Sequence, residues 1–521
     1  MNLAILHYHL RPGGVFQVIA NQLRSLNNTL SVDDPYRVAI FHGIENEDEC
    51  SSQWPMSSHL QVSTRAIDGL GYDQESKSST ETSSLATRLL TALDACQFFP
   101  QDTVIHVHNH SLGKNTSLPG ALKIIAGKGY PLLLQIHDFA EDFRVEQYQH
   151  LNTMLGSSSL GLGSLLYPQA SHIHYAVLNG RDRQILSTSG VLNERLHALP
   201  NPIVATEDLP DRMNVRQEML VQRGIPVEDP LVIYPVRGIR RKNLGELLLW
   251  SALFKHRASF GTTLAPKNNA EKPAYNRWKT LAEKLHLPCH FELGESFAFK
   301  QNLAAADALI TTSVAEGFGM VFLESQLGGR RLLGRDLPEI TTEFVENGID
   351  LASLYRTLFI PTQFVGKDHA IEAISTAYGE VLRGFASARY CEQTTRRSLA
   401  EMLSRGVVDF AFLTPELQEQ VILHVHKHQN AVDEILELNP LLEKSLFHQD
   451  AESSTQRGIV VNREAVKDHY GPSSIGIQLR DIYCNLLGTS RDKDIFPLTC
   501  SEAILESFLN LERFRPVRSM S

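Results

Sequence analysis

The chain has 521 residues, more than one ordinary domain needs, so at least two domains are expected. Its 42% hydrophobic and 21% charged residues are normal for a globular protein. The balance of 49 basic against 59 acidic residues gives a formal net charge of -10, which argues against a general nucleic-acid binder, because such proteins carry a basic surface.

Short apolar runs alternate with amphipathic helical patterns over the first 200 residues. The helical patterns include Phe16–Leu26 and Ser84–Leu93. This alternation predicts an α/β fold with a doubly wound sheet. The predicted strands are Leu3–His7, Arg37–Phe41, Thr103–Val107, Pro131–Ile136 and His172–Leu178.

A proline-rich stretch, Leu199-Pro200-Asn201-Pro202, is interpreted as the linker to a second domain. A second α/β alternation begins about 30 residues later and predicts another Rossmann-like sheet. Its predicted strands are Leu231–Val236, Cys289–Leu293, Ala308–Thr312 and Leu332–Leu333.

The remaining third of the chain is helical by pattern, and no strand is expected between residues 366 and 450. A further helical region, Val461–Leu487, is interrupted at Gly471-Pro472. We therefore predict four parts: residues 1–205, 206–365, a helical insertion at 366–455, and C-terminal helices at 456–521 that return to the first domain.

The N-terminus and the cysteines indicate the compartment. Met1–Leu10 is apolar but lacks a basic start and a small-residue cleavage site, so it is not a signal peptide. No apolar run is long enough to span a bilayer. Scattered cysteines without C-x-x-C spacing predict reduced thiols and a cytoplasmic protein. They are Cys50, Cys96, Cys289, Cys391, Cys484 and Cys500.

Histidines follow several predicted strands of the first domain. Ligands bind outside the carboxyl ends of strands in open α/β sheets, so these side chains together predict a polar cleft. A single one is better explained as a polar cap of the sheet. His106, His108 and His110 share a strand face, but no fourth zinc ligand is indicated by spacing, and no metal is predicted. The histidines are His7, His9, His42, His106, His108, His110 and His137.

A glycine pair, Gly13-Gly14, lies between the first strand and the first helix. Glycines at such a turn let a ligand approach the backbone, and the helix N-terminus favours an anion. The pattern is not G-x-G-x-x-G, so NAD binding is not supported.

A basic run, Arg237-Gly238-Ile239-Arg240-Arg241-Lys242, follows the first strand of the second domain. Four cations in six residues at a strand end could neutralise a diphosphate. A solvated basic turn would explain the run if it stood alone.

Two glutamates and a glycine turn follow the strand Ala308–Thr312. Glu316 precedes Gly317-Phe318-Gly319, which opens a helix, and Glu324 lies two turns further. The helix spacing places the two carboxylates ~12 Å apart at ~1.5 Å per residue. That separation suits one carboxylate on a sugar and one on a ribose, and it is too wide for a paired acid and base, which sit ~5–10 Å apart.

In these motifs the chain resembles the family 4 glycosyltransferases of the GT-B fold, in which two Rossmann-like domains face a cleft. The resemblance covers roughly residues 1–345 and rests on order and spacing. It includes Arg-x4-Lys at Arg237 and Lys242, Glu-x7-Glu at Glu316 and Glu324, Gly13-Gly14, His137-Asp138, the linker's Asn-Pro and the turn Gly334–Glu339. Asn179 departs from the family, where a serine is usual.

The resemblance implies roles for individual residues. Arg237 and Lys242 would hold the donor diphosphate, with Gly13 and Gly14 beside it. Glu316 would bind the donor sugar together with the backbone amides of Phe318, Gly319 and Met320. Glu324 would bind the ribose, and His137 would lie near the transferred sugar. The acceptor is expected at His108, Asn109, His110 and the loop Ser111–Thr116.

The implied activity is transfer of a hexose, with retention, from a UDP-, GDP- or ADP-linked sugar to a hydroxyl acceptor. Residues 1–205 would bind the acceptor, a sugar, a glycerate-type molecule or another small hydroxyl compound, and residues 206–365 the nucleotide sugar. No cofactor or metal is implied, and a homodimer is left open. Two alternatives stay open: a non-hydrolysing nucleotide-sugar epimerase and a non-catalytic nucleotide-sugar-binding protein.

Overall fold

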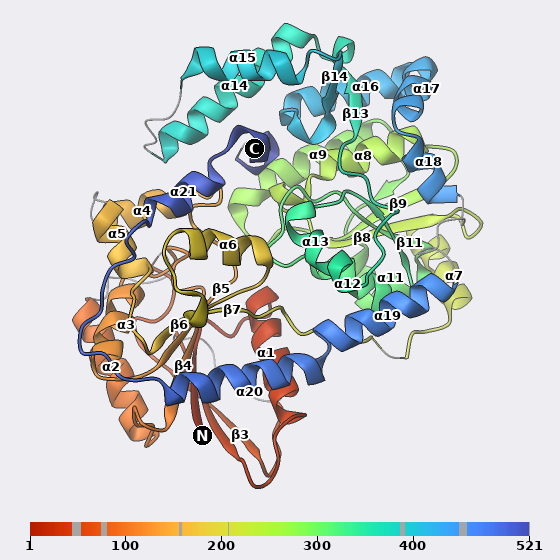
Figure 1. The fold of residues 1–521 in the computed structure, drawn as a ribbon. Helices are drawn as coiled ribbons and strands as arrows, with labels where there is room; N and C mark the ends of the chain where they lie inside the picture. The colour runs from red at the N-terminus through yellow and green to blue at the C-terminus, as the bar shows by residue number, and fades with distance from the viewer. Residues whose placement is uncertain are drawn as a thin grey trace. The chain divides into compact units, whose positions relative to one another are not determined.

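The computed structural model describes residues 1–43, 54–73, 81–155, 159–206, 208–385, 391–447 and 456–519, so Cys50 lies outside the described residues. The chain forms two compact units (Figure 1). The first unit contains Met1–Val204 and Lys467–Asn510, and the second contains Ala205–Val466 and Leu511–Ser521. The chain therefore passes between the units three times.

The first unit is built on a seven-stranded parallel sheet with the order β3-β2-β1-β4-β5-β6-β7. Four of its strands, β1, β4, β5 and β6, are buried along their whole length, as expected for a parallel sheet covered on both faces. The strands are β1 (Asn2–Leu6), β2 (Tyr36–His42), β3 (Leu60–Ala66), β4 (Thr103–His108), β5 (Leu132–Ile136), β6 (Ile173–Val177) and β7 (Leu196–Ala198).

Helix α20, from the far end of the sequence, completes the core of this unit by packing against α1 (Figure 1). Leu23 of α1 belongs to the same core cluster as Ile475 and Leu479 of α20, and all three are fully buried. Each contributes about 1.5–3 kcal/mol through apolar burial. The helices are α1 (Gly14–Asn27), α2 (Thr82–Ala95), α3 (Leu118–Gly127), α4 (Val145–Leu155), α5 (Ser159–Leu166), α6 (Gly180–Thr188), α20 (Pro472–Gly488) and α21 (Glu502–Phe508).

The second unit contains a five-stranded parallel sheet with the order β10-β9-β8-β11-β12. In both sheets the first strand lies in the interior of the sheet, and the strand order reverses next to it, which is the Rossmann arrangement. The predicted α/β class with two such sheets is confirmed. The strands are β8 (Leu231–Arg237), β9 (Ser259–Leu264), β10 (Cys289–His290), β11 (Ala308–Thr311) and β12 (Arg331–Gly334). The helices around them are α7 (Arg212–Arg223), α8 (Leu244–Leu253), α9 (Lys272–Lys284), α10 (Leu293–Ser296), α11 (Phe299–Ala305), α12 (Met320–Leu327) and α13 (Pro338–Glu346).

A helical region follows within the second unit, and its helix α16 packs on α8. It also holds a small antiparallel sheet of β13 (Phe359–Pro361) and β14 (Val407–Asp409). The expectation of no strand between residues 366 and 450 was therefore wrong, because a three-residue strand leaves no periodic pattern. The helices are α14 (Lys367–Gly384), α15 (Glu392–Met402), α16 (Pro415–Lys427), α17 (Gln429–Leu438), α18 (Pro440–Phe447) and α19 (Gln456–Tyr470).

Three strands of the two parallel sheets escaped prediction: β3, β7 and β9. β3 is an edge strand with mostly exposed polar residues, β7 has only three residues, and β9 contains a glycine. Leu293, predicted to end a strand, instead begins α10. The predicted break at Gly471-Pro472 is confirmed, since α19 ends at Tyr470 and α20 begins at Pro472.

The limits of the units differ from the predicted parts in the C-terminal region. We expected residues 456–521 to return to the first domain as a whole. Residues up to Val466 and from Leu511 onward instead pack in the second unit. Among the helices that the structure describes, none combines the length and the apolar character needed to cross a membrane.

Candidate active site

In the second unit, Glu316 accepts bonds from the basic run predicted to bind a diphosphate. Its Oε1 accepts hydrogen bonds from the Lys242 ammonium and from the Ser313 hydroxyl, the latter at 2.5 Å. Its Oε2 accepts a bond from Arg241 at 3.1 Å. Glu316 is only 8% exposed. The structure thus brings two of the predicted catalytic residues, Lys242 and Glu316, into one buried ion pair.

Backbone contacts hold this basic turn, Arg240–Lys242, on the loop after β11. The Thr312 hydroxyl donates to the Lys242 carbonyl at 2.9 Å. The Val314 amide donates to the Arg241 carbonyl, also at 2.9 Å. Asn243 then turns the chain into α8 with a left-handed φ of 47°. Cations from β8 and the carboxylate from β11 therefore meet because adjacent parallel strands end side by side.

Helix α12 begins at Met320, four residues after Glu316. Gly319 caps it with a φ of 79°, and an added Cβ there would lie 2.7 Å from the Phe322 ring. This turn therefore requires glycine. The first amides of a helix are not bonded within the helix, and an anion is favoured there. Phe318 is buried beside the turn, and Met320 begins the helix.

The pKa values in this cluster follow from burial and charge together. Burial raises the pKa of Glu316, but Lys242 and Arg241 outweigh it and hold the pKa below its usual range. Burial lowers the pKa of Lys242, against the opposing effect of Glu316. Burial raises the pKa of Glu324 to about 7, although Lys242 acts in the other direction. The charge of Lys242 therefore interacts with both glutamates of the predicted motif.

The other two cations of the run have different partners. Arg237 donates to the carbonyl of Ala265 at 2.9 Å, and burial lowers its pKa. Arg240 pairs with Glu271 at 3.3 Å. Arg241, which the sequence motif did not single out, is the arginine that reaches Glu316. Its one sequence signal was its place beside Lys242.

A buried charged network lies behind the basic turn. Arg335 makes paired bonds to Glu246, at 3.0 and 2.6 Å, and to Asp409, at 3.0 and 2.8 Å. The Glu246 carboxylate also accepts bonds from Tyr355 at 2.8 Å and from Asn243 at 3.0 Å. Asn243 directly follows Lys242, so the network fixes the base of the turn.

In the first unit, the ends of β4 and β5 bring His108 and His137 together. His108 Nδ1 lies 2.9 Å from His137 Nε2, and the two rings stack with centroids 5.2 Å apart. His7, from the end of β1, contacts His108 edge-on with centroids 6.4 Å apart. The histidine cluster predicted at this edge is therefore formed by side chains of three neighbouring strands.

His106 is the innermost histidine of this cluster, and it stacks on His108 at 4.3 Å. Its Nε2 lies 3.0 Å from the Gln135 amide oxygen, and its Nδ1 lies 2.8 Å from the Tyr483 hydroxyl. Because the amide oxygen can only accept, Nε2 carries the proton and Nδ1 accepts from Tyr483. Both ring nitrogens are used, so His106 has none for a metal.

Asn109 fixes the loop after β5. It adopts a left-handed φ of 60°, and its Oδ1 accepts the backbone amides of His137 at 2.7 Å and Asp138 at 3.1 Å. Its carbonyl accepts the Tyr8 hydroxyl at 2.8 Å. His110 lies beyond the strand, with Nε2 2.7 Å from the Leu166 carbonyl oxygen. His42 contacts the carbonyl of Gly43 instead of the cluster.

The clustered histidines are buried and uncharged at neutral pH. Burial lowers the pKa of His7 and of His106 to about 3, and that of His110 and of His137 to about 4. Burial likewise holds the pKa of His108 well below its usual range. A neutral imidazole can exchange hydrogen bonds with hydroxyl groups but offers no positive charge to a phosphate.

The glycine turn before α1 is exposed. A Cβ added at Gly14 would meet nothing within 4 Å, and one added at Gly13 would lie 3.8 Å from the nearest atom. Gly13 has an extended backbone, with φ of -177°. Local packing does not require glycine at either position. Because glycine has no side chain, the space at the helix N-terminus stays open.

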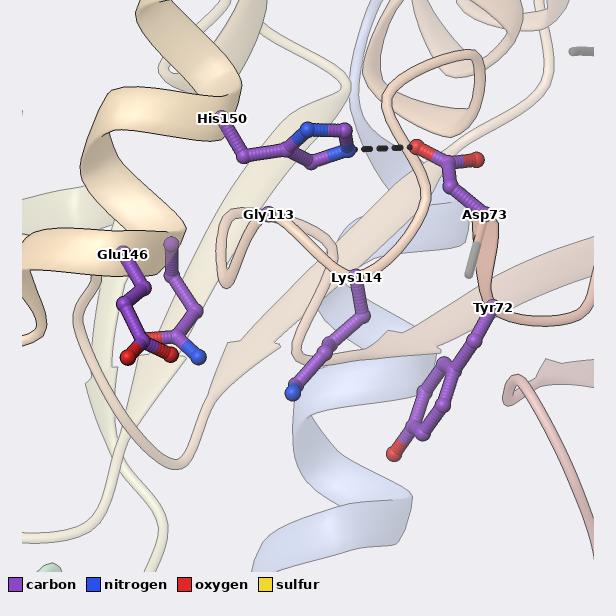
Figure 2. Close-up of a pocket in the computed structure, with 7 residues that line it drawn as sticks. Tyr72, Asp73, Gly113, Lys114, Glu146 and His150 are labelled. Atoms are coloured by element: carbon purple, nitrogen blue, oxygen red, sulfur yellow. Dashed lines mark hydrogen bonds and ion pairs between the residues drawn. The ribbon is translucent and has the colours of Figure 1, made fainter. Parts of the chain in front are cut away.

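A surface pocket lies on the loop that we predicted to face the acceptor (Figure 2). Lys114 and Tyr72 extend side by side, with the ammonium 5.3 Å from the ring centroid. Tyr72 also contacts His9 at 3.1 Å, which joins the pocket to the histidine cluster. His150 and Asp73 also line the pocket and are bonded at 3.0 Å. Gly113, Glu146 and Gln147 complete the lining.

Two known proteins are similar to this chain over nearly its whole length. The mannosylglucosyl-3-phosphoglycerate synthase of Petrotoga mobilis is 24% identical over 534 aligned positions, which cover 99% of each chain. The solved sucrose-phosphate synthase of Thermosynechococcus elongatus matches with a TM-score of 0.52 and 13% identity, covering 93% of this chain and 98% of that one. No protein-family model matches the chain.

The structural match shows the fold, two Rossmann-like units of the GT-B type. Lys242 of the Arg-x4-Lys motif and Glu316 of the Glu-x7-Glu motif meet in one buried ion pair. The chain is a glycosyltransferase of the GT-B fold, similar to the family 4 enzymes.

Proposed function

We propose that this protein transfers a hexose, with retention, from a nucleotide-diphosphate sugar to a hydroxyl of a phosphorylated glycerate-type glycoside. The observation that carries the proposal is the buried cluster of Glu316, Lys242 and Arg241 at the start of α12. The acceptor class is taken from the relative, which is a mannosylglucosyl-3-phosphoglycerate synthase.

The donor diphosphate is assigned to Lys242, Arg241 and the amides at Phe318, Gly319 and Met320. Two cations and a helix N-terminus concentrate positive potential where the leaving group gains charge. Arg237 remains assigned to the same diphosphate; it must exchange its bond to the Ala265 carbonyl for a bond to phosphate.

The donor sugar and ribose are assigned to the two glutamates. Glu316 accepts bonds from sugar hydroxyls when the diphosphate draws Lys242 away from it. Glu324 accepts bonds from the ribose hydroxyls. Among the described residues, no hydrogen bond to the Glu324 side chain forms. Its pKa of about 7 reflects a buried carboxylate, and hydrogen bonds from ribose hydroxyls would stabilise its ionised form.

The reaction exchanges two bonds at the anomeric carbon. The bond to the leaving phosphate oxygen breaks, the bond to the acceptor oxygen forms on the same face, and the acceptor proton passes to the departing diphosphate. His137 is uncharged and held by His108 and Asn109. Its assigned role is to orient and polarise a sugar hydroxyl. Gly13 and Gly14 keep their predicted place beside the diphosphate.

The acceptor is assigned to the pocket of Lys114 and Tyr72. A lysine and a tyrosine hydroxyl suit a phosphate or carboxylate, and the adjoining neutral histidines suit the hydroxyls of a sugar. His108, Asn109 and His110 stay in this assignment as the inner boundary of the acceptor region. A cytoplasmic location is proposed with it, supported by the five described cysteines, which form no disulfide.

The test is a nucleotide-release assay with UDP-, GDP- and ADP-linked hexoses and glucosyl-3-phosphoglycerate as acceptor. We expect one donor to react, release to require the acceptor, and the product to keep the anomeric configuration of the donor by NMR. Removing the acceptor's phosphate should raise KM and leave the donor's KM unchanged. Conversion of the donor to an epimer without acceptor would overturn the proposal in favour of an epimerase. Donor binding without turnover on any acceptor would overturn it in favour of a binding protein.

A further inference from the structure

The last described segment of the second unit, Leu511–Ser519, packs under the basic turn. Val517 is only 4% exposed and forms a small apolar cluster with Val314 and Ala411, which are 7% and 0% exposed. Its 3₁₀ turn, Pro516–Arg518, also lies against the turn Arg240–Lys242. A segment from the opposite end of the chain thus covers the floor of the cluster around Glu316.

Val314 connects this apolar cluster to the charged groups. Its amide donates to the Arg241 carbonyl at 2.9 Å. It also precedes Glu316 by two residues on the same loop. A shift of Val314 therefore moves the backbone of both the arginine and the glutamate.

Arg515 gives a second connection through charge. Its guanidinium lies over the Phe412 ring at 5.6 Å, and its charge acts on Asp409. Asp409 is bonded to Arg335, and Arg335 to Glu246. The Glu246 carboxylate accepts the side-chain amide of Asn243, the residue that follows Lys242.

Two further contacts hold the segment on this unit. Arg513 pairs with Glu339 at 2.8 Å, and the Phe514 ring packs against Tyr378 with centroids 5.2 Å apart. Phe514 is fully buried. The segment is therefore integrated into the second unit on both sides of Arg515.

We propose that Val517 and Arg515 are positioning residues, which hold Arg241, Lys242 and Glu316 in the geometry that binds the donor diphosphate. The inference rests on the proposed donor site. Neither residue is assigned a contact with substrate. Donor affinity therefore depends on a segment about 270 residues after the basic turn in the sequence. Weaker packing of this segment would displace the groups of the anion site without changing their charges.

The test compares Val517→Ala with Val461→Ala, which removes the same atoms from a side chain that is 54% exposed on α19. Calorimetry with UDP, GDP and ADP measures affinity, and nucleotide release measures donor KM and kcat, both well below the unfolding temperature. We expect Val517→Ala to weaken nucleoside-diphosphate binding and raise donor KM about five- to tenfold, because misplaced preorganised groups lose binding energy. Val461→Ala should match wild type, and Val517→Ile should retain most of the affinity.

Arg515→Gln tests the charged connection and serves if Val517→Ala does not fold. It should raise donor KM in the same direction. In an Arg241→Ala background the effect of Val517→Ala should shrink, because coupled residues are not additive. A lowered unfolding temperature with unchanged affinity in both variants would overturn the inference and leave a structural role only. Absence of binding of all three nucleotides to wild type would instead overturn the proposed donor site.

Discussion

The sheet of the second unit repeats the order of the first five strands of the other sheet, but the two units bury polar groups differently. In the first unit the strand ends carry imidazoles that burial keeps neutral, joined by hydrogen bonds such as His108 to His137. In the second unit the strand ends carry charged groups, and the buried carboxylate of Glu316 is paired with Lys242. Burial of a polar group is tolerated in both ways, by neutralisation or by pairing.

Because of this difference, we expect the strand ends of the two units to bind different kinds of ligand group. A neutral histidine cluster exchanges hydrogen bonds with hydroxyls, while paired cations can release a carboxylate and take up a diphosphate instead. The two edges should therefore respond differently to loss of a charge and to pH.

The charged edge should be the more sensitive to loss of one partner. Arg335→Ala removes the cation between Glu246 and Asp409 and leaves two carboxylates buried without it. We expect a loss of roughly 3–5 kcal/mol in the free energy of unfolding. Urea denaturation measures it. Arg356→Ala is the control, since Arg356 is 76% exposed and its pair with Asp336 should contribute less than about 1 kcal/mol. Equal losses in the two variants would contradict the importance of the network.

Within that edge, the cation bonded to Glu316 should matter most for turnover. We expect Lys242→Ala to lower kcat by about 100- to 1000-fold, because a preorganised charge at the leaving group is lost. Arg240→Ala is a matched control, because Arg240 belongs to the same turn but pairs with Glu271. Nucleotide release measures both. Comparable losses would show that the turn as a whole, and not the Lys242 charge, supports the reaction.

The neutral edge should make the first unit acid-sensitive. His137 and His110 have pKa values near 4 in the folded chain and near 6.5 when unfolded. The unfolded state therefore binds more protons between those values, so stability is fully present above pH 6.5 and falls as pH drops toward 4. Thermal unfolding from pH 7.5 to 4.5 measures the slope, and His110→Gln should reduce it. A pH-independent midpoint would contradict the buried neutral cluster.

The smallest effect on stability is expected at the glycine turn. Gly14→Ala meets no atom within 4 Å and should change the free energy of unfolding by less than about 0.5 kcal/mol. If a ligand approaches this backbone, kcat/KM should still fall, and a tenfold fall corresponds to about 1.4 kcal/mol. Gly127→Ala, at another open position, should leave kcat/KM unchanged. Wild-type kcat/KM in Gly14→Ala would remove this turn from the site.

Most of the fold could be predicted from the sequence, because buried parallel strands appear in it as apolar runs. The sequence assigned Lys242 and Glu316 to one donor site, and the two side chains meet because the ends of neighbouring strands coincide in a sheet. It did not indicate that Arg241 bonds to Glu316. The 3₁₀ turn Arg240–Lys242 directs adjacent cations to different sides, and linear spacing does not encode that rotation. The contact between Tyr483 and His106 could not be predicted, because the two residues are 377 positions apart in the sequence.

The return of α20 to the first unit has a consequence for the order of folding during synthesis. Val204 ends the first stretch of this unit, but its core also needs Ile475 and Leu479. Some 270 residues separate them, which takes roughly 15–60 s to translate at typical ribosome speeds. Throughout that interval the buried face of α1 lacks its cover. A nascent chain of this protein should thus expose an apolar groove to chaperones until the second unit has already emerged.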